Sequence, residues 1–162
     1  MDVDLLGTDE AGLGRAVGHL RRGEVVGFPT DTVYGLAALA WDERAVARVF
    51  EIKGRPRSQP LIMMFSEQAQ AGQVAEVGER ERACMARWWP GPLTLVLRAR
   101  PGLRPPLVSG EPPTVGVRVP DHPVALALLR AAEAPLATTS ANRSGRPPAM
   151  TAEEAASLEG LA

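Results

Sequence analysis

The chain has 162 residues, 45% of them hydrophobic, and a net charge of −1, which is typical of one ordinary soluble globular domain. The balanced charge argues against a uniformly basic nucleic-acid-binding protein. Cys84 is the only cysteine, which excludes an intrachain disulfide and a cysteine-based structural zinc site. We expect a cytoplasmic protein without a membrane segment, because residues 1–10 are acidic and no apolar run approaches the roughly 20 residues of a membrane span.

The hydrophobic pattern predicts helices alternating with short strands. Helices are expected over residues 9–22, 42–52, 79–88 and 121–134, after Ser66, and from residue 151. Strands are expected over residues 24–29, within 30–40, and over 60–65, 92–99, 114–120 and 135–140. Residues 100–113 form a proline-rich loop. This alternation predicts a single-domain α/β fold with a mixed β-sheet and flanking helices.

Residues with known terminal preferences support these boundaries. Asp42 is placed to cap the second helix, and Gly23 is placed to end the first. Pro123 suits the first turn of the helix over 121–134. Thr151 and Glu154 have the spacing of a capping box.

Several common catalytic motifs are missing from the sequence. It contains no G-x-x-x-x-G-K-[ST] phosphate loop, no H-E-x-x-H zinc motif and no G-x-S-x-G nucleophile motif. Residues 12–18, "GLGRAVG", lie within a predicted helix and do not match a dinucleotide-binding loop. His19 and His122 are far apart in sequence, and we interpret both as structural or surface residues.

A set of cations and short hydroxyl-bearing side chains remains as the candidate site. Lys53 is the only lysine among the 18 basic residues, and Arg55 and Arg118 add two guanidinium groups. Arginine offers a planar fork for carboxylates or phosphates, whereas lysine offers a compact point charge. These residues suit an anionic ligand that carries both phosphates and a carboxylate. Alone, each motif also fits a solvated turn or a polar strand end.

Five sequence blocks, taken in order, resemble the YrdC-like family of threonylcarbamoyl-AMP synthases. They are P-T-D-T-V-Y-G-L (29–36), K-G-R-P with P-L-I (53–62), W-P-G-P-L-T (89–94), V-G-V-R-V-P-D-H-P (115–123) and T-T-S-A-N-x-S-G (138–145). The resemblance implies an open, twisted α/β sheet with a positively lined concave face. It also implies a nucleotidyltransferase that makes threonylcarbamoyl-AMP from L-threonine, bicarbonate or CO2 and ATP, for t6A modification of tRNA.

The resemblance assigns roles by motif position. Thr32, Arg118 and Thr138 are expected on the threonine side, with Arg118 pairing with the substrate carboxylate. On the nucleotide side we expect Lys53, Arg55, Gln59, Thr114, Ser140, Asn142 and Pro148. Lys53 and Arg55 are the expected catalytic cations. Mg2+ is expected with ATP, with no metal ligand assigned among the protein side chains, and the expected partners include tRNA and a t6A transferase complex.

Two features of the sequence depart from the family pattern. Many relatives carry histidine at the end of the P-L-I strand, where this chain has Met64. The family's Ser-Thr-Val-Val-like strand after T-S-A-N is absent, so we expect residues 1–162 to form one YrdC-like domain without it. The alternative hypothesis is a paralogue that binds RNA or nucleotide without synthesis, and an unrelated small-molecule enzyme is a third.

Overall fold

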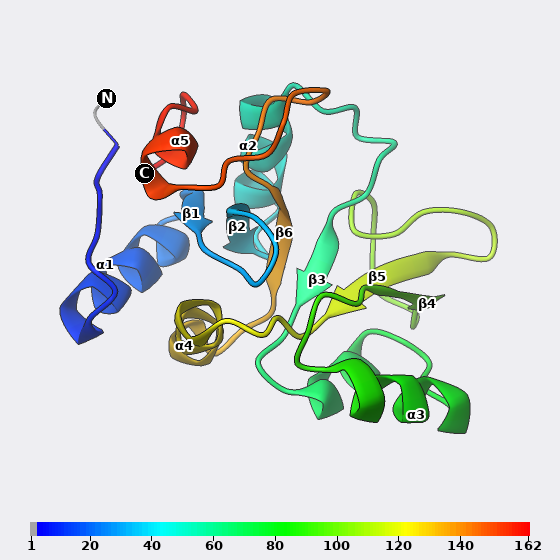
Figure 1. Cartoon of the computed structure of the whole chain (residues 1–162). Coiled ribbons are helices and arrows are strands. Elements are labelled where there is room, and N and C mark those ends of the chain that lie inside the picture. The colour runs from blue at the N-terminus through cyan, green and yellow to red at the C-terminus, as the bar shows by residue number, and fades with distance from the viewer. Residues whose placement is uncertain (1–2) are drawn as a thin grey trace.

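The computed structural model describes residues 3–162. A six-stranded sheet with helices on both faces forms its centre (Figure 1). The helices are α1 (Glu10–Arg21), α2 (Glu43–Lys53), α3 (Glu79–Trp88), α4 (Pro123–Ala132) and α5 (Ala152–Ala156), with a 3-10 helix η1 (Gln68–Gln73). The strands are β1 (Val26–Phe28), β2 (Gly35–Leu39), β3 (Ile62–Met64), β4 (Leu95–Arg98), β5 (Thr114–Arg118) and β6 (Leu136–Ser140). The predicted single-domain α/β fold with an open mixed sheet is confirmed.

The strand order is β1-β2-β6-β3-β5-β4. Only β3 and β5 pair in parallel, while the other four pairings are antiparallel. Since β6 runs antiparallel to β3, the end of β6 lies opposite to the ends of β3 and β5. Polar residues that follow β5 and β6 in sequence therefore lie toward opposite ends of the sheet.

Local residue choices explain the helix that precedes the site. The Asp42 carboxylate accepts hydrogen bonds from the backbone N–H groups of Arg44 (3.0 Å) and Ala45 (3.1 Å), which caps the start of α2 as predicted. Gly54 ends the helix in the left-handed conformation, at φ 60°. Lys53 is therefore the last helical residue, one position beyond the predicted end of this helix at residue 52.

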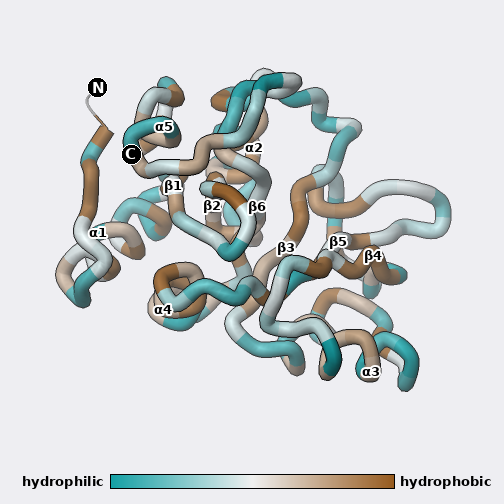
Figure 2. Tube along the Cα trace, in the orientation of Figure 1, coloured by the Kyte–Doolittle hydropathy of each residue, from teal (hydrophilic) through white to brown (hydrophobic). Residues whose placement is uncertain are grey.

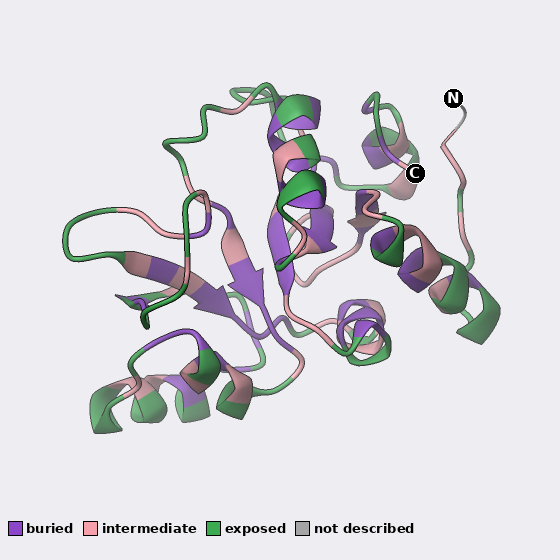
Figure 3. Cartoon of the chain, turned by 180° about the vertical axis from the view of Figure 1, so that it is seen from behind, coloured by how far each residue is buried: buried purple, intermediate pink, exposed green. Residues whose placement is uncertain are grey.

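Side chains alternate between two buried clusters on the two faces of the sheet. Leu36, Met63 and Ala137 point into the cluster that α2 covers, while Ala37, Met64 and Leu136 point into the cluster beneath α1 and α4. Seen from behind, α2 lies across the buried strands (Figure 3). Its buried face includes Val46, Val49 and Phe50, which is the stripe that the sequence predicts.

The helices α1 and α4 leave part of their face of the sheet uncovered. Three residues on this part of the sheet are not buried by α1 or α4. Val96 is 67% exposed, and Ile62 and Gly116 are half-buried. Figure 2 shows that the connection from α2 to β3 is hydrophilic, whereas β3 and β5 are hydrophobic. The uncovered face thus has an apolar floor with a polar rim.

Three predicted local features differ in the structure. The segment after Ser66 is a 3-10 helix whose N-cap residue is Glu67. The helix expected over 121–134 begins at Pro123 instead, with His122 as its N-cap, because His122 Nδ1 accepts a hydrogen bond from Val124 N at 3.2 Å. Thr151 caps α5 as expected, but Glu154 accepts from Met150 N at 2.6 Å, so only half of the predicted capping box forms.

None of the helices within residues 3–162 is long and apolar enough to cross a membrane.

Candidate functional site

Arg118 is a buried cation at the end of β5. Its side chain is only 8% exposed, and Nε donates to the Gly91 carbonyl oxygen at 3.0 Å. Gly91 N in turn donates to the Val119 carbonyl oxygen at 2.9 Å, which fixes the W-P-G-P loop beside the end of β5. The loop therefore orients the guanidinium group by holding the one N–H that does not belong to its terminal fork.

The loop between β1 and β2, which lie at the opposite edge of the sheet from β5 and β4, reaches Arg118. Figure 1 shows this loop, residues 29–34, passing in front of β6 between α4 and α5. Asp31 forms a buried ion pair with Arg118 Nη2, and Thr32 Oγ1 lies 3.4 Å from Nη1. Thr30 Oγ1 lies 3.0 Å from Thr32 Oγ1 and donates to the Val33 carbonyl oxygen. The P-T-D-T segment thus surrounds the guanidinium with one carboxylate and one hydroxyl.

Lys53 lies at the opposite end of β6, in a compact hydrogen-bonded cluster. Lys53 as a whole is only 2% exposed, and its Nζ donates to Ser140 O (2.7 Å) and to Asn142 Oδ1 (2.6 Å). Ser140 Oγ lies 3.4 Å from Nζ and donates to Asn142 Oδ1 at 2.6 Å. The backbone closes the same cluster, because Ser144 N donates to Lys53 O at 2.8 Å. The predicted residues Lys53, Ser140 and Asn142 are therefore in direct contact.

Burial changes the protonation equilibrium of this lysine. Loss of hydration, followed by the positive charge of Arg55, lowers the pKa of Lys53 from 10.5 to about 8. Loss of hydration also lowers the pKa of Arg55. Lys53 is still mainly cationic at pH 7, and an incoming anion would relieve the unfavourable burial of its charge.

Arg55 and Gln59 lie in the connection from α2 to β3. Arg55 donates from Nε to Gln59 O (3.0 Å) and from Nη2 to Pro60 O (3.1 Å). The Arg55 guanidinium therefore stabilises the conformation of its own loop, and part of the group remains accessible. The Gln59 side chain is exposed. Thr114, the first residue of β5, donates its hydroxyl hydrogen to Ser109 O at 3.1 Å.

The strand register arranges the predicted residues by their position along the sheet. Met64 pairs with both Arg118 and Leu136, whereas Ser140 lies four residues further along β6. At about 3.4 Å per residue, that offset is about 14 Å along the strand. Thr138, which pairs with Ile62, lies halfway. Of the residues expected on the threonine side, Arg118 and its neighbour Thr32 thus lie toward one end and Thr138 lies in the middle, whereas Lys53, Ser140 and Asn142, expected on the nucleotide side, lie toward the other end.

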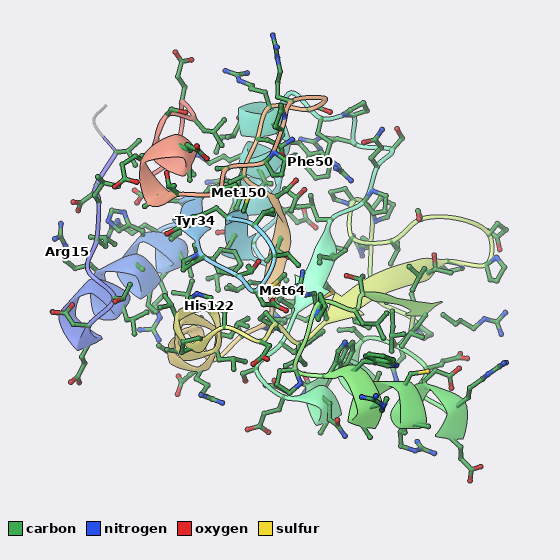
Figure 4. All side chains as sticks on the ribbon, in the orientation of Figure 1. Arg15, Tyr34, Phe50, Met64, His122 and Met150 are labelled. Carbon is green, nitrogen blue, oxygen red and sulfur yellow. The ribbon has the colours of Figure 1, made fainter. Side chains whose placement is uncertain are left out.

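Backbone hydrogen bonds around Tyr34 connect the two ends. Tyr34 N donates to Ala149 O (2.9 Å), and Ala141 N donates to Tyr34 O (2.8 Å). Tyr34 and Met150 lie beside each other in Figure 4, consistent with this pairing. Pro148, expected on the nucleotide side, is exposed one residue before this contact. The loop that follows β6 is therefore attached to the loop that carries Asp31.

Met64 occupies the position where the family pattern predicts histidine. It ends β3 (Figure 4) and is 4% exposed, within the cluster that contains Leu136 and Leu128. Its thioether belongs to the core that supports Arg118, its neighbour across the β3–β5 pair. Met64 therefore contributes packing rather than a titratable group.

Asp31 is a candidate functional residue that the sequence motifs did not identify. It stands between Thr30 and Thr32 in the quoted motif, but its pairing with Arg118 spans 87 positions of sequence. Two side-chain atoms within residues 3–162 are buried without a hydrogen-bond partner, and they are Asp31 Oδ2 and Thr138 Oγ1. Such atoms are uncommon in protein interiors, so each needs a donor or acceptor that the described protein does not supply.

Nothing in the described part of the chain resembles a metal centre: residues 3–162 contain no group of three or more His, Cys, Asp or Glu side chains that could hold an ion. Together, the open sheet and its two cationic ends define an α/β protein whose cations are suited to an anionic ligand.

The comparisons with known proteins give the family. The Sua5/YciO/YrdC family model, described as "Telomere recombination", matches residues 18–160. The chain belongs to this family, as the sequence blocks predict.

Two curated relatives carry the name threonylcarbamoyl-AMP synthase. The protein from Bacillus subtilis is 43% identical over 155 residues, covering 95% of this chain and 45% of its own length. The protein from Pyrococcus abyssi is 46% identical over 142 residues, covering 87% of this chain and 42% of its own. This chain therefore spans less than half the length of these relatives.

Solved structures agree with the fold. The structure of P. abyssi Sua5 complexed with L-threonine superimposes with a TM-score of 0.83 at 41% identity, over 93% of this chain and 44% of that one. Escherichia coli YciO superimposes with a TM-score of 0.77 at 27% identity, over 90% of this chain and 70% of that one.

Proposed function

We propose that this chain synthesises L-threonylcarbamoyladenylate from L-threonine, bicarbonate or CO2 and ATP, as a nucleotidyltransferase. The observation that carries the proposal is the pair of buried cations, Lys53 and Arg118, which lie toward opposite ends of β6. A nucleotide joined to an amino acid has its phosphates and its carboxylate at separate points, and this spacing suits such a molecule. The names of the relatives and the threonine-bound Sua5 structure support the same substrates.

The Lys53 end is assigned to the nucleotide. Lys53 and Arg55 would face the phosphates, with Ser140 and Asn142 fixing the ammonium group and offering further hydrogen bonds. Gln59, Thr114 and Pro148 would line the remaining nucleotide surface. A phosphate group that displaces one of the present acceptors of Lys53 would exchange a neutral oxygen for a charged one, which strengthens the hydrogen bond.

The Arg118 end is assigned to the amino acid. The guanidinium would pair with the substrate carboxylate, and Thr32 lies beside it. The hydroxyl of Thr138 is buried without a partner midway between the ends, where the amino acid and the nucleotide would meet. It is thus placed to bind a polar atom near the new bond.

The chemistry follows from bringing two anions together. The threonine amine and bicarbonate condense to a carbamate with loss of water. A carbamate oxygen then attacks the α-phosphorus of ATP, and the bond to pyrophosphate breaks. Cations fixed in place before the reaction offset the repulsion and the developing charge. Positioning of the reactants provides the remaining advantage, on the order of 7–11 kcal/mol for well-oriented groups.

The cofactor and partners are assigned on chemical grounds. Mg2+ would enter with ATP, held by phosphate oxygens and water rather than by a protein cage. The product would supply t6A modification of tRNA in the cytoplasm, through a transferase complex. The activity is assigned to a single YrdC-like domain formed by this chain.

The decisive experiment measures product directly. The chain is incubated with ATP, Mg2+, bicarbonate and labelled L-threonine, and threonylcarbamoyl-AMP and pyrophosphate are quantified. Pyrophosphate release that requires threonine is the expected result. A folded protein that releases none, or that releases the same amount without threonine, contradicts the proposal. RNA binding that weakens steeply with salt, without turnover, would instead support the binding paralogue.

A further inference from the structure

We propose that Asp31 positions the amino acid by accepting a hydrogen bond from its α-amino group, so that Asp31 and Arg118 together recognise a zwitterion. This inference rests on the proposed function in taking the Arg118 end as the amino-acid subsite. The relevant observation is how incompletely the two side chains pair with each other.

Asp31 uses one of its two carboxylate oxygens on Arg118. Oδ1 accepts from Nη2, while Oδ2 is buried and lacks a hydrogen-bond partner within residues 3–162. The Asp31 side chain is 13% exposed, so little water reaches it. A buried carboxylate oxygen without a donor is unfavourable, and an N–H group from a ligand would satisfy it.

Arg118 also retains donor capacity. Nε is committed to Gly91 O at 3.0 Å, but the contacts of Nη1 and Nη2 with Thr32 Oγ1 are long, at 3.4 and 3.5 Å. The terminal N–H groups of Arg118 can therefore donate to a carboxylate while the hydrogen bonds to Gly91 O and Asp31 remain in place. A cationic donor and an anionic acceptor are then available side by side.

The charges favour a ligand with no net charge of its own. The pair of Asp31 and Arg118 is neutral overall and nearly buried, at 13% and 8% side-chain exposure. An α-amino acid zwitterion matches both members, with its carboxylate on Arg118 and its amine on Asp31. A carboxylic acid without the amine would leave Oδ2 unsatisfied, and a site with an unpaired polar group discriminates strongly against such an analogue.

The experiment compares L-threonine with 3-hydroxybutyrate, which keeps the carboxylate and hydroxyl but lacks the amine. Calorimetric titration of the wild-type chain should give at least about tenfold tighter binding of L-threonine, equivalent to about 1.4 kcal/mol. In Asp31→Asn the two affinities should agree within about threefold. Asp121→Asn, at an exposed aspartate before α4, is the matched control and should keep the wild-type ratio.

The outcomes separate this inference from the proposed function. An unchanged ratio in Asp31→Asn, alongside turnover of threonine by the wild type, overturns the inference and leaves the function standing. Selection of a different L-α-amino acid over its deaminated analogue, with the same dependence on Asp31, supports the inference and refutes threonine as the substrate. Failure of the wild type to bind any L-α-amino acid overturns both.

A second variant covers a folding defect. Asp31→Glu keeps the charge but displaces the carboxylate by about one bond length. If Asp31→Asn does not fold, the ratio in Asp31→Glu should fall at least about threefold below wild type. A wild-type ratio in the folded glutamate variant overturns the inference.

Discussion

Replacing Lys53 with methionine separates the role of its charge from the role of its packing. Methionine keeps most of the side-chain length but removes the ammonium group that donates to Ser140 O and Asn142 Oδ1 at 2.7 and 2.6 Å. Two charge-assisted hydrogen bonds contribute about 3–6 kcal/mol of folding stability before the cost of burying the charge. The fall in the lysine pKa from 10.5 to about 8 puts that cost at about 3 kcal/mol.

The stability change should therefore be modest. We expect Lys53→Met to lose about 0–3 kcal/mol of unfolding free energy at pH 7, which lowers the melting temperature by at most about 12 °C. Turnover should fall at least about 100-fold, because the phosphates lose a fixed cation, and this corresponds to about 2.7 kcal/mol.

The assay pairs pyrophosphate release with denaturant unfolding at a temperature where the variant is folded. Arg48→Met removes an exposed cation from the same helix and should leave both measurements unchanged. A folded Lys53→Met enzyme that retains more than about a tenth of wild-type turnover would refute the assignment of Lys53 to the phosphates.

Three further predictions test the fold and the two ends of the site. The folded-state pKa of Lys53 lies below the unfolded value, so the unfolding free energy of wild type relative to Lys53→Met should rise between about pH 8 and 10.5, by about 3 kcal/mol in total. A difference that stays constant with pH in denaturant titrations would contradict the burial of this lysine. Arg118→Lys should raise the KM for threonine at least about tenfold and leave the KM for ATP nearly unchanged, because lysine lacks the two parallel N–H groups that bind a carboxylate. Equal effects on both constants would contradict the assignment of threonine and ATP to separate ends of the site. Gly116→Ala should lower the unfolding free energy by about 1–2 kcal/mol in chemical denaturation, since its Cβ would lie 2.9 Å from Ile62 Cγ2, and unchanged stability would show that Ile62 moves aside freely.

Local structure was largely predictable from sequence because its determinants are close together. The cap at Asp42, the left-handed Gly54 and the alternation through β5 follow from residue types within a few positions of each other. The errors were also local: α4 begins at Pro123 rather than at residue 121, with the His122 ring nitrogen as its cap, and the segment after Ser66 forms a 3-10 helix.

The arrangement of the site was not predictable, because it depends on strand order and direction. The motif blocks suggest which residues matter, but not that β6 runs against β5 and places Ser140 and Arg118 toward opposite ends. Contacts such as Lys53 with Asn142, 89 positions apart, and Asp31 with Arg118 require the folded sheet. The family resemblance suggests a role for each residue, and only the structure provides the spacing between the residues.

The backbone contacts of Tyr34 have a thermodynamic consequence for substrate binding. Any ligand that orders the loop after Ser140 also restrains Tyr34, through the hydrogen bonds of its N–H and C=O groups, and so restrains the loop that carries Asp31. The conformational entropy lost at one end then need not be lost again at the other. The nucleotide and amino acid of the proposed function should consequently bind with positive cooperativity, and linkage requires each to raise the affinity of the other by the same factor.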